Sequence, residues 1–193
     1  MIRNILAFAL SVALVFTPGV QGALAAGQPR VELQTTMGNI VLELYPDKAP
    51  RTVKNFLGYV KSGFYNDMIF HRVVAGFVIQ AGDLDKKMVE YETKGPIRNE
   101  ATNGLKNVRG TLAMARGADP NSADAQFFIN LQDNPSLDFQ DRTPQDYGYC
   151  VFGRVVQGMD VVDAIGGVKT HDFKGYQDVP VKPVVIQKAK ILD

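Results

Sequence analysis

The sequence predicts a mainly β protein that closes into an antiparallel barrel of about eight strands accompanied by two helices. Eight short apolar segments have the lengths and polar boundaries of strands, whereas only two segments have a helical period. The 193 residues, 46% of them hydrophobic, are enough for one domain with a core of its own. Closing the sheet leaves no edge strand exposed, so we expect a barrel rather than an open sheet.

The first predicted elements are a hairpin and a helix. Segments 31–35 and 40–45 flank a turn at Met37-Gly38-Asn39, and apolar and polar residues alternate in the second segment, which predicts a hairpin. Segment 50–62 has apolar residues at positions i, i+3, i+4 and i+7. This spacing predicts a helix that begins near the proline at its start and ends at the glycine that follows it.

Strands and long loops make up most of the remaining chain. Two short apolar runs, 70–74 and 77–81, are split by Ala75-Gly76 and predict a second tight strand pair. Two polar segments, 83–110 and 132–148, predict long loops, and loops of such length in a compact domain usually carry function. The other predicted elements are a short helix at 160–165 and strands at 111–115, 126–131, 149–156 and 184–192.

Composition excludes several classes of function. Lys and Arg number 21 and Asp and Glu number 20, so no excess of positive charge is available to bind a nucleic-acid backbone. The single cysteine, Cys150, excludes an internal disulfide and multi-cysteine metal sites, and its apolar neighbours predict a buried thiol rather than a nucleophile. The two histidines, His71 and His171, lie far apart in the sequence. We therefore expect no metal and no nucleic-acid partner.

The N-terminal segment has the parts of a secretory signal peptide. A basic start is followed by an apolar run at 5–16, by Pro18-Gly19, and by the small-residue pattern Ala23-Leu24-Ala25. The alternative is a retained membrane anchor, but a span needs about twenty apolar residues and Pro18-Gly19 interrupts this run. We therefore predict a signal peptide at 1–25, removed to leave one domain at 26–193. The mature protein is expected to be exported, soluble and not bound to a membrane.

One segment, residues 70–83, is a candidate binding site. Arg72 lies among apolar residues, and a partly buried guanidinium requires a partner, which is either a carboxylate or a ligand. Strand alternation places Val78 and Gln80 on one face, beside the turn that brings Phe77 near Arg72. An apolar wall with one amide and one guanidinium suits an uncharged, carbonyl-rich ligand such as a peptide. An arginine that forms an ion pair at a barrel rim is the alternative, and the residues alone leave both open.

Several motifs closely resemble those of the cyclophilins. They are Phe70-His71-Arg72 with 76–83, the segments 110–115, 121–122 and 126–130, and 151–156 with Gly158-Met159-Asp160. The resemblance covers residues 30–193, and the sequences at 96–101 and 103–105 are similar to those of the bacterial branch, including its exported members. It implies an eight-stranded barrel capped by two helices, located in the periplasm. It also implies peptidyl-prolyl cis–trans isomerase activity on proline-containing polypeptides, without cofactor or metal.

The resemblance also implies roles for individual residues. Arg72 matches the catalytic arginine of the family, and Gln80 matches its peptide-binding glutamine. The other implied substrate-binding residues are the proline-ring pocket of Phe77, Val78, Phe128 and Leu137, the backbone-binding strip of Ala115 and Arg116, and the polar wall of Gln126.

Two positions depart from the family pattern. Tyr149 stands where many members have a pocket histidine, and its ring keeps an aromatic wall there. Ser136 precedes Leu137-Asp138, where members that bind cyclosporin tightly have a tryptophan. Because serine supplies little apolar contact and no indole N–H, we expect weak cyclosporin binding.

The chemistry of rotation about the X–Pro bond explains how an arginine could catalyse it. Amide resonance sets a barrier of roughly 18–20 kcal/mol, and twisting the bond localises a lone pair on the prolyl nitrogen. A donor such as Arg72 would stabilise that twisted state, while Phe77, Phe128 and Leu137 hold the ring. Rotation needs no acid or base, so we interpret His71 as structural.

Two functions from different classes remain open on the sequence. The first is an exported isomerase that acts on unfolded or folding exported proteins, expected to be a monomer. The second is a proline-peptide binding module or chaperone on the same barrel with little catalysis. The combination of Arg72, Gln80 and Phe128 favours the enzyme, because a pure binder has no need of the arginine.

Overall fold

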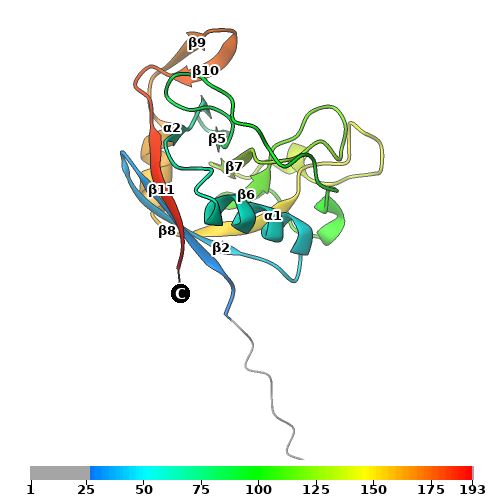
Figure 1. Cartoon of the computed structure of the whole chain (residues 1–193). Coiled ribbons are helices and arrows are strands. Elements are labelled where there is room, and N and C mark those ends of the chain that lie inside the picture. Colours follow the sequence, from blue (N-terminus) through cyan, green and yellow to red (C-terminus); the bar gives the residue numbers. More distant parts are fainter. Residues whose placement is uncertain (1–26, 193) are drawn as a thin grey trace, which may run out of the picture.

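A single antiparallel sheet runs around the molecule and closes on itself in the computed structural model, which describes residues 27–192 (Figure 1). The order of its strands is β3-β11-β1-β2-β8-β6-β7-β5-β4. The two ends of this order, β3 and β4, are separated in the chain only by Phe70 and His71, so they act as one strand that joins both edges. Counted in this way the barrel has eight strands, and the predicted fold class is confirmed. The signal peptide predicted at 1–25 lies outside the described residues.

The strand bounds agree with the predicted segments to within a few residues. They are β1 (Arg30–Thr35), β2 (Gly38–Leu44), β3 (Met68–Ile69), β4 (Arg72–Val74), β5 (Val78–Ala81), β6 (Thr111–Met114), β7 (Phe127–Asn130), β8 (Val151–Gln157) and β11 (Val185–Leu192). The strand predicted at 70–74 is wrong in one respect, because pairing is interrupted at its first two residues and resumes before them as β3. The two predicted loops contain only short 3₁₀ turns, Ala101–Asn103 and Pro135–Leu137.

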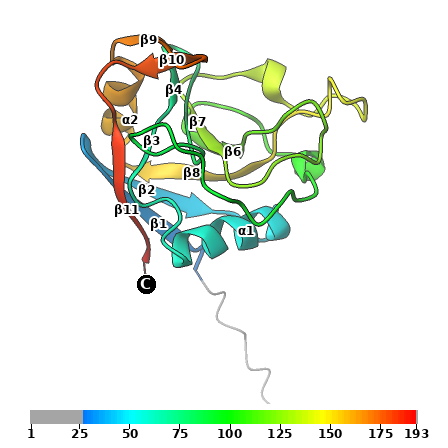
Figure 2. The same ribbon diagram turned by 45° about the horizontal axis from the view of Figure 1, so that its top comes forward.

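Both predicted helices are present, as α1 (Pro50–Lys61) and α2 (Met159–Gly166), on different sides of the barrel (Figure 2). The apolar stripe of α1, which includes Phe56, and that of α2, which includes Ile165, join the interior cluster of the barrel. The start of α1 receives its cap from a distant loop, since the Glu100 carboxylate accepts hydrogen bonds from the backbone N–H groups of Arg51 and Thr52. No helix among residues 27–192 has the length and apolar character that a membrane span requires.

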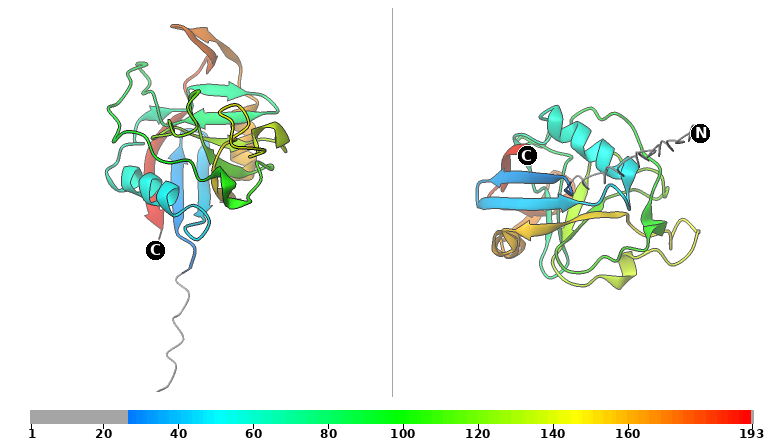
Figure 3. Two further views of the ribbon diagram at one scale, coloured as in Figure 1. Left: turned by 90° about the vertical axis from the view of Figure 1, so that its right-hand side faces the viewer. Right: turned by 90° about the horizontal axis from the view of Figure 1, so that it is seen from below.

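One hairpin was not predicted. It consists of β9 (Thr170–Phe173) and β10 (Tyr176–Pro180), and it projects from the molecule at the end opposite the C-terminal end of β11 (Figures 1 and 3). All four residues of β9 are exposed, so they lack the alternation that marks a half-buried strand. The hairpin is nevertheless placed firmly, because β10 packs against β4.

Strand alternation divides the side chains of β5, β6 and β7 between two apolar clusters. The inward-facing residues belong to the barrel core: Ile79, Ala81, Leu112, Met114, Phe127 and Ile129. The residues between them point out of the barrel, and Val78, Ala113 and Phe128 form a second, smaller cluster with Val151. A buried apolar cluster on the outside of a barrel needs a cover or a ligand, so this face is the candidate site.

Candidate active site

The register of four strands brings the central residues of this face into one row. Arg72 on β4 pairs with Gln80 on β5, Gln80 pairs with Phe128 on β7, and Phe128 pairs with Ala113 on β6. Neighbouring strands lie about 4.8 Å apart, and directly paired residues point to the same side of a sheet. Residues from three separate segments of the chain therefore meet on one outer face.

A pocket of about 240 Å³ lies over this row. It is lined by nine residues: Arg72, Phe77, Val78, Gln80, Ala115, Arg116, Phe128, Leu137 and Tyr149. All nine belong to the set of site residues named from the sequence. The tenth, Gln126, lies next to the pocket and accepts a hydrogen bond from Gln80 through its Oε1 atom, at 2.9 Å.

The polar side chains of the pocket form a connected chain. Arg72 donates from Nη1 to Gln80 Oε1 at 3.4 Å, so the amide nitrogen of Gln80 is left to donate to Gln126. Gln126 can approach Gln80 because Gly82 has a positive φ of 96° and no side chain. A Cβ atom at Gly82 would lie 2.7 Å from the Ala125 carbonyl oxygen. These contacts fix the orientation of the guanidinium and of both amides before any ligand binds.

Arg72 also has a carboxylate partner that the sequence did not reveal. Its Nε atom lies 3.9 Å from Asp178 Oδ2, and the two side chains are 38% and 40% exposed. Both alternatives left open by the sequence therefore hold at once, since the guanidinium lines the pocket and forms an ion pair at its rim. Asp178 was missed because it belongs to the β9–β10 hairpin, and only the packing of β10 against β4 brings it to the site.

Arg116 and Tyr149 form another part of the pocket wall, which several contacts hold in place. Arg116 donates to the carbonyl oxygens of Gly148 and Pro144, both at 3.0 Å, and its guanidinium lies 4.9 Å from the centre of the Tyr149 ring. The Tyr149 ring in turn meets Phe128 edge to face, with ring centres 5.6 Å apart. Tyr149 is therefore an integral part of the pocket wall.

Comparison with known proteins identifies the protein family in which this pocket occurs. Residues 30–191 match the family described as cyclophilin type peptidyl-prolyl cis-trans isomerase/CLD. The chain belongs to this family. Among its relatives is peptidyl-prolyl cis-trans isomerase cyp18 of Streptomyces antibioticus, which is 58% identical over 84% of this chain and 98% of that protein. Peptidyl-prolyl cis-trans isomerase B of Escherichia coli is 55% identical over 83% of this chain and 98% of its own length.

Two further similarities cover the N-terminal segment and the fold. Peptidyl-prolyl cis-trans isomerase A of Dickeya dadantii is 49% identical over 100% of this chain and 99% of its own. A crystal structure of a Cryptosporidium parvum cyclophilin in the presence of the dipeptide Ala-Pro has a TM-score of 0.70 and 26% identity. The match covers 85% of this chain and 99% of that one. The cyclophilin fold and the isomerase activity are thereby shown, and between enzyme and pure binding module the relatives decide for the enzyme.

Within this cyclophilin, His71 and Cys150 are packed into the scaffold. Burial lowers the pKa of His71 to about 4, with a smaller contribution from Arg72, so the imidazole is neutral at neutral pH. Its Nδ1 atom is buried and has no hydrogen-bond partner among residues 27–192. Burial raises the pKa of Cys150 to about 11, so the group is a thiol rather than a reactive thiolate. The burial predicted for Cys150 is confirmed.

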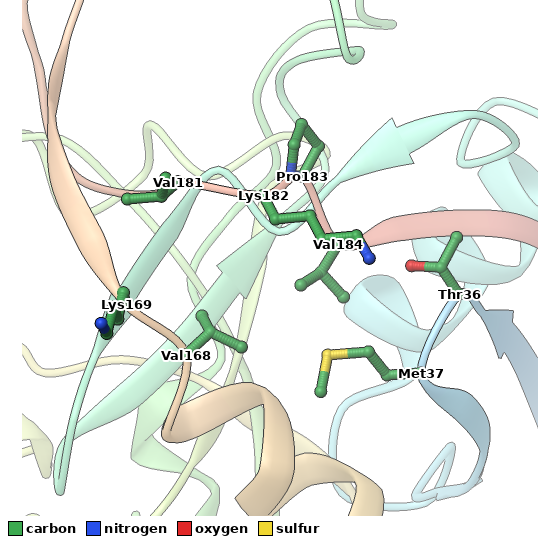
Figure 4. A pocket seen from close by; sticks show the side chains of 8 residues that line it. All are labelled: Thr36, Met37, Val168, Lys169, Val181, Lys182, Pro183 and Val184. Carbon is green, nitrogen blue, oxygen red and sulfur yellow. The ribbon is translucent and has the colours of Figure 1, made fainter.

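A second cavity, of about 460 Å³, lies away from the cyclophilin pocket (Figure 4). The turn between β1 and β2, the segment after α2 and the segment before β11 line it with Thr36, Met37, Val168, Lys169, Val181, Lys182, Pro183 and Val184. None of these residues belongs to the site predicted from the sequence. Across residues 27–192 no group of three or more His, Cys, Asp or Glu side chains is arranged to hold a metal ion.

Proposed function

We propose that this cyclophilin accelerates X–Pro rotation in exported polypeptides, with Arg72 as its catalytic residue. The observation that carries the proposal is the pocket itself, in which a fixed guanidinium stands beside an apolar wall of Phe77, Phe128 and Leu137. The test is an assay of refolding limited by one cis proline, with catalysis expected from the isolated protein. A protein that binds proline peptides without changing the refolding rate would contradict it.

The mechanism uses binding energy alone. As the X–Pro bond twists, amide resonance is lost and the prolyl nitrogen gains a lone pair that can accept a hydrogen bond. A guanidinium is a permanently charged donor. The guanidinium of Arg72 is oriented by Gln80 and Asp178, so it is preorganised to donate to that nitrogen. The interaction is stronger in the twisted state than in either planar isomer, which is the condition for catalysis.

The apolar wall would hold the proline ring while the rest of the peptide turns. Phe128 is buried at the base of the pocket, and Leu137 reaches it from the loop after β7. The Tyr149 backbone N–H donates to the Leu137 carbonyl oxygen at 2.9 Å, which keeps that loop against β8. The Cryptosporidium parvum cyclophilin structure obtained with Ala-Pro supports a proline-containing ligand for this pocket.

The site of action proposed here is the periplasm, with residues 1–25 removed as a signal peptide. The apolar run and the Ala23-Leu24-Ala25 pattern support export, and the Dickeya dadantii relative aligns with the whole chain, N-terminal segment included. Intact-mass measurement of protein recovered from the native host is expected to show a start near Ala26. Recovery of membrane-bound protein that still carries residues 1–25 would contradict export.

A further inference from the structure

A groove runs along α1, away from the isomerase pocket. Its main part has a volume of about 590 Å³ between one face of α1 and the segment at residues 94–98, and these two segments lie side by side in Figure 2. An adjoining hollow of about 300 Å³ shares Arg51 and Arg98 with it and extends it past Lys48. We call the two together the α1 groove.

The α1 groove concentrates positive charge on a chain that is close to neutral. Five cationic side chains line it: Lys48, Arg51, Lys54, Lys94 and Arg98. None of the five forms an ion pair with any residue in 27–192, although six ion pairs occur elsewhere in that range. Glu100 is the one acidic residue that lines the groove, and its carboxylate is engaged by α1. The surplus of positive charge therefore faces solvent.

The walls of the groove are held by contacts with the core. The Lys94 backbone N–H donates to the Tyr59 hydroxyl at 2.8 Å, and the Lys94 ammonium lies 4.8 Å from the centre of the same ring. Ile97, half-buried against the core, donates from its backbone to the Ala123 carbonyl oxygen at 2.8 Å. The floor is thus partly apolar and the cations stand above it on two sides.

We propose that the α1 groove binds acidic segments of polypeptide chains. A substrate polypeptide would thus be held in the groove while one of its X–Pro bonds is isomerised in the pocket of the same molecule. The proposal rests on the proposed isomerase function. Opposed rows of cations over an apolar floor fit an extended chain that carries both carboxylates and apolar side chains. A lipid surface is flat and cannot enter a groove, so the concave shape favours a polypeptide over a membrane.

The probe is a fluorescent, proline-free decapeptide of alternating Glu and Ala, with a Lys–Ala decapeptide as its counterpart. The groove variant is Arg51→Gln, Lys54→Gln and Arg98→Gln together, and the matched control is Lys169→Gln, Lys182→Gln and Lys188→Gln. In the groove variant, the loss of three ion pairs between the groove and the acidic peptide is expected to weaken binding of that peptide by about tenfold or more. In the control variant, binding is expected to weaken by less than about twofold. Binding by the parent is also expected to fall between about 50 and 300 mM salt.

Turnover of a short uncharged proline peptide separates this proposal from the isomerase function, because the groove variant is expected to keep it. In the unmodified protein, NMR shifts caused by the acidic peptide should map to α1 and residues 94–98. Equal losses in both triple variants, shifts elsewhere, or no peptide binding would overturn the proposal. Sedimentation of the protein with anionic vesicles, in the absence of peptide binding, would assign the groove to a membrane and overturn it as well.

A separate observation concerns Asp178. It lies at a β-bulge in β10 with a positive φ of 56°, a conformation that aspartate and asparagine tolerate better than most residues. This geometry places its carboxylate on the Nε edge of Arg72, while Gln80 contacts the Nη1 edge. We infer that Asp178 is a positioning residue that, together with Gln80, fixes the plane of the catalytic guanidinium.

The test compares Asp178→Asn, which suits the same backbone conformation, with Asp172→Asn on the neighbouring exposed strand. Loss of one orienting ion pair is expected to lower kcat about three- to tenfold with little change in KM, because the planar fork loses its alignment. The Arg72 Nε–Hε NMR resonance is expected to shift in Asp178→Asn and to stay unchanged in Asp172→Asn. An unchanged kcat or an unchanged resonance in a folded Asp178→Asn would overturn the positioning role while leaving the isomerase function intact.

Discussion

The isomerase pocket and the α1 groove both display arginines, but they hold them in opposite ways. In the pocket, Arg72 contacts Gln80 and Asp178, and Arg116 donates to four backbone carbonyl groups. In the groove, Arg51 and Arg98 form no ion pair within residues 27–192. A fixed donor can favour one geometry of a bond over another, whereas an unpaired cation contributes mainly a salt-dependent attraction. The difference separates a region built for catalysis from one suited to attraction of charge.

Removal of the fixed guanidinium is expected to have the largest effect. A charge-assisted hydrogen bond to the twisted amide contributes about 1.5–3 kcal/mol, so Arg72→Ala should lower kcat/KM at least ten- to hundredfold. Arg72→Lys should also be poor, because a flexible point charge does not reproduce the planar fork. The measurement is refolding of a substrate limited by one cis proline.

Circular dichroism serves as the control for folding of each Arg72 variant, since a side chain that is 38% exposed does not fill the core. A folded Arg72→Ala that keeps its rate within about threefold of the parent would leave confinement by the apolar wall as the main source of catalysis. The distinction between the pocket and the groove would then lose its chemical basis.

The next effect concerns two titratable groups that flank the pocket strands β4 and β5 in the chain, His71 and Asp83, whose protonation should change stability in opposite directions. Burial raises the pKa of Asp83 to about 6, with smaller contributions from Glu90 and Asp124. The folded state therefore binds a proton there that the unfolded state releases near pH 4. This contribution is present at low pH and is lost as the pH rises through 6. His71 has the opposite sign, because its lowered pKa makes the folded state lose stability as the pH falls from about 6.5 towards 4.

Urea unfolding at pH 7.5 and 4.5 would separate the two groups. After allowance for partial exposure, Asp83→Asn should make the fall in unfolding free energy on acidification steeper than in the parent by about 1–2 kcal/mol. His71→Gln should make it shallower. Identical pH dependence in the parent and both variants would show that neither group is shifted as described.

A smaller effect is expected at the open edge of the pocket. Ser136 is exposed beside Leu137, so it adds little to the apolar wall. Ser136→Trp should tighten cyclosporin binding by about tenfold through added apolar contact and one N–H donor, with a smaller change in peptide turnover. Titration of both proteins with cyclosporin measures this. Nanomolar inhibition of the unmodified protein would contradict it.

The smallest expected effect is that of pH on the rate itself. Rotation transfers no proton and an arginine stays charged, so kcat/KM should change by less than about twofold between pH 6 and 9. A bell-shaped profile in this range would mean that a titrating group takes part in the reaction. His71 would be the first to examine, because it lies next to Arg72 in the chain.

Local patterns in the sequence predicted the elements well where each buries one face. The hairpin of β1 and β2 was predicted from the alternation of apolar and polar residues, and α1 was predicted from its apolar spacing. Both patterns arise because one face of each element packs against the core, which repeats apolar residues every strand pleat or helical turn. The β9–β10 hairpin was not predicted because the exposed residues of β9 show no such pattern. The motifs around Arg72, Gln80 and Phe128 went further, and through their resemblance to the cyclophilins they indicated nine residues that line one pocket.

Only the tertiary structure decided how those residues are held. The pairing of Gln80 with Phe128 joins residues 48 positions apart, and the ion pair of Arg72 with Asp178 joins residues 106 positions apart. The loop that lies along α1 likewise depends on contacts between segments far apart in the chain. No local propensity records such contacts, because β register and hairpin docking are set by cross-strand pairing and by the shape of the core. By itself, therefore, the sequence indicated the nine side chains that line the pocket, while the packing of distant strands determined their partners, Asp178 among them.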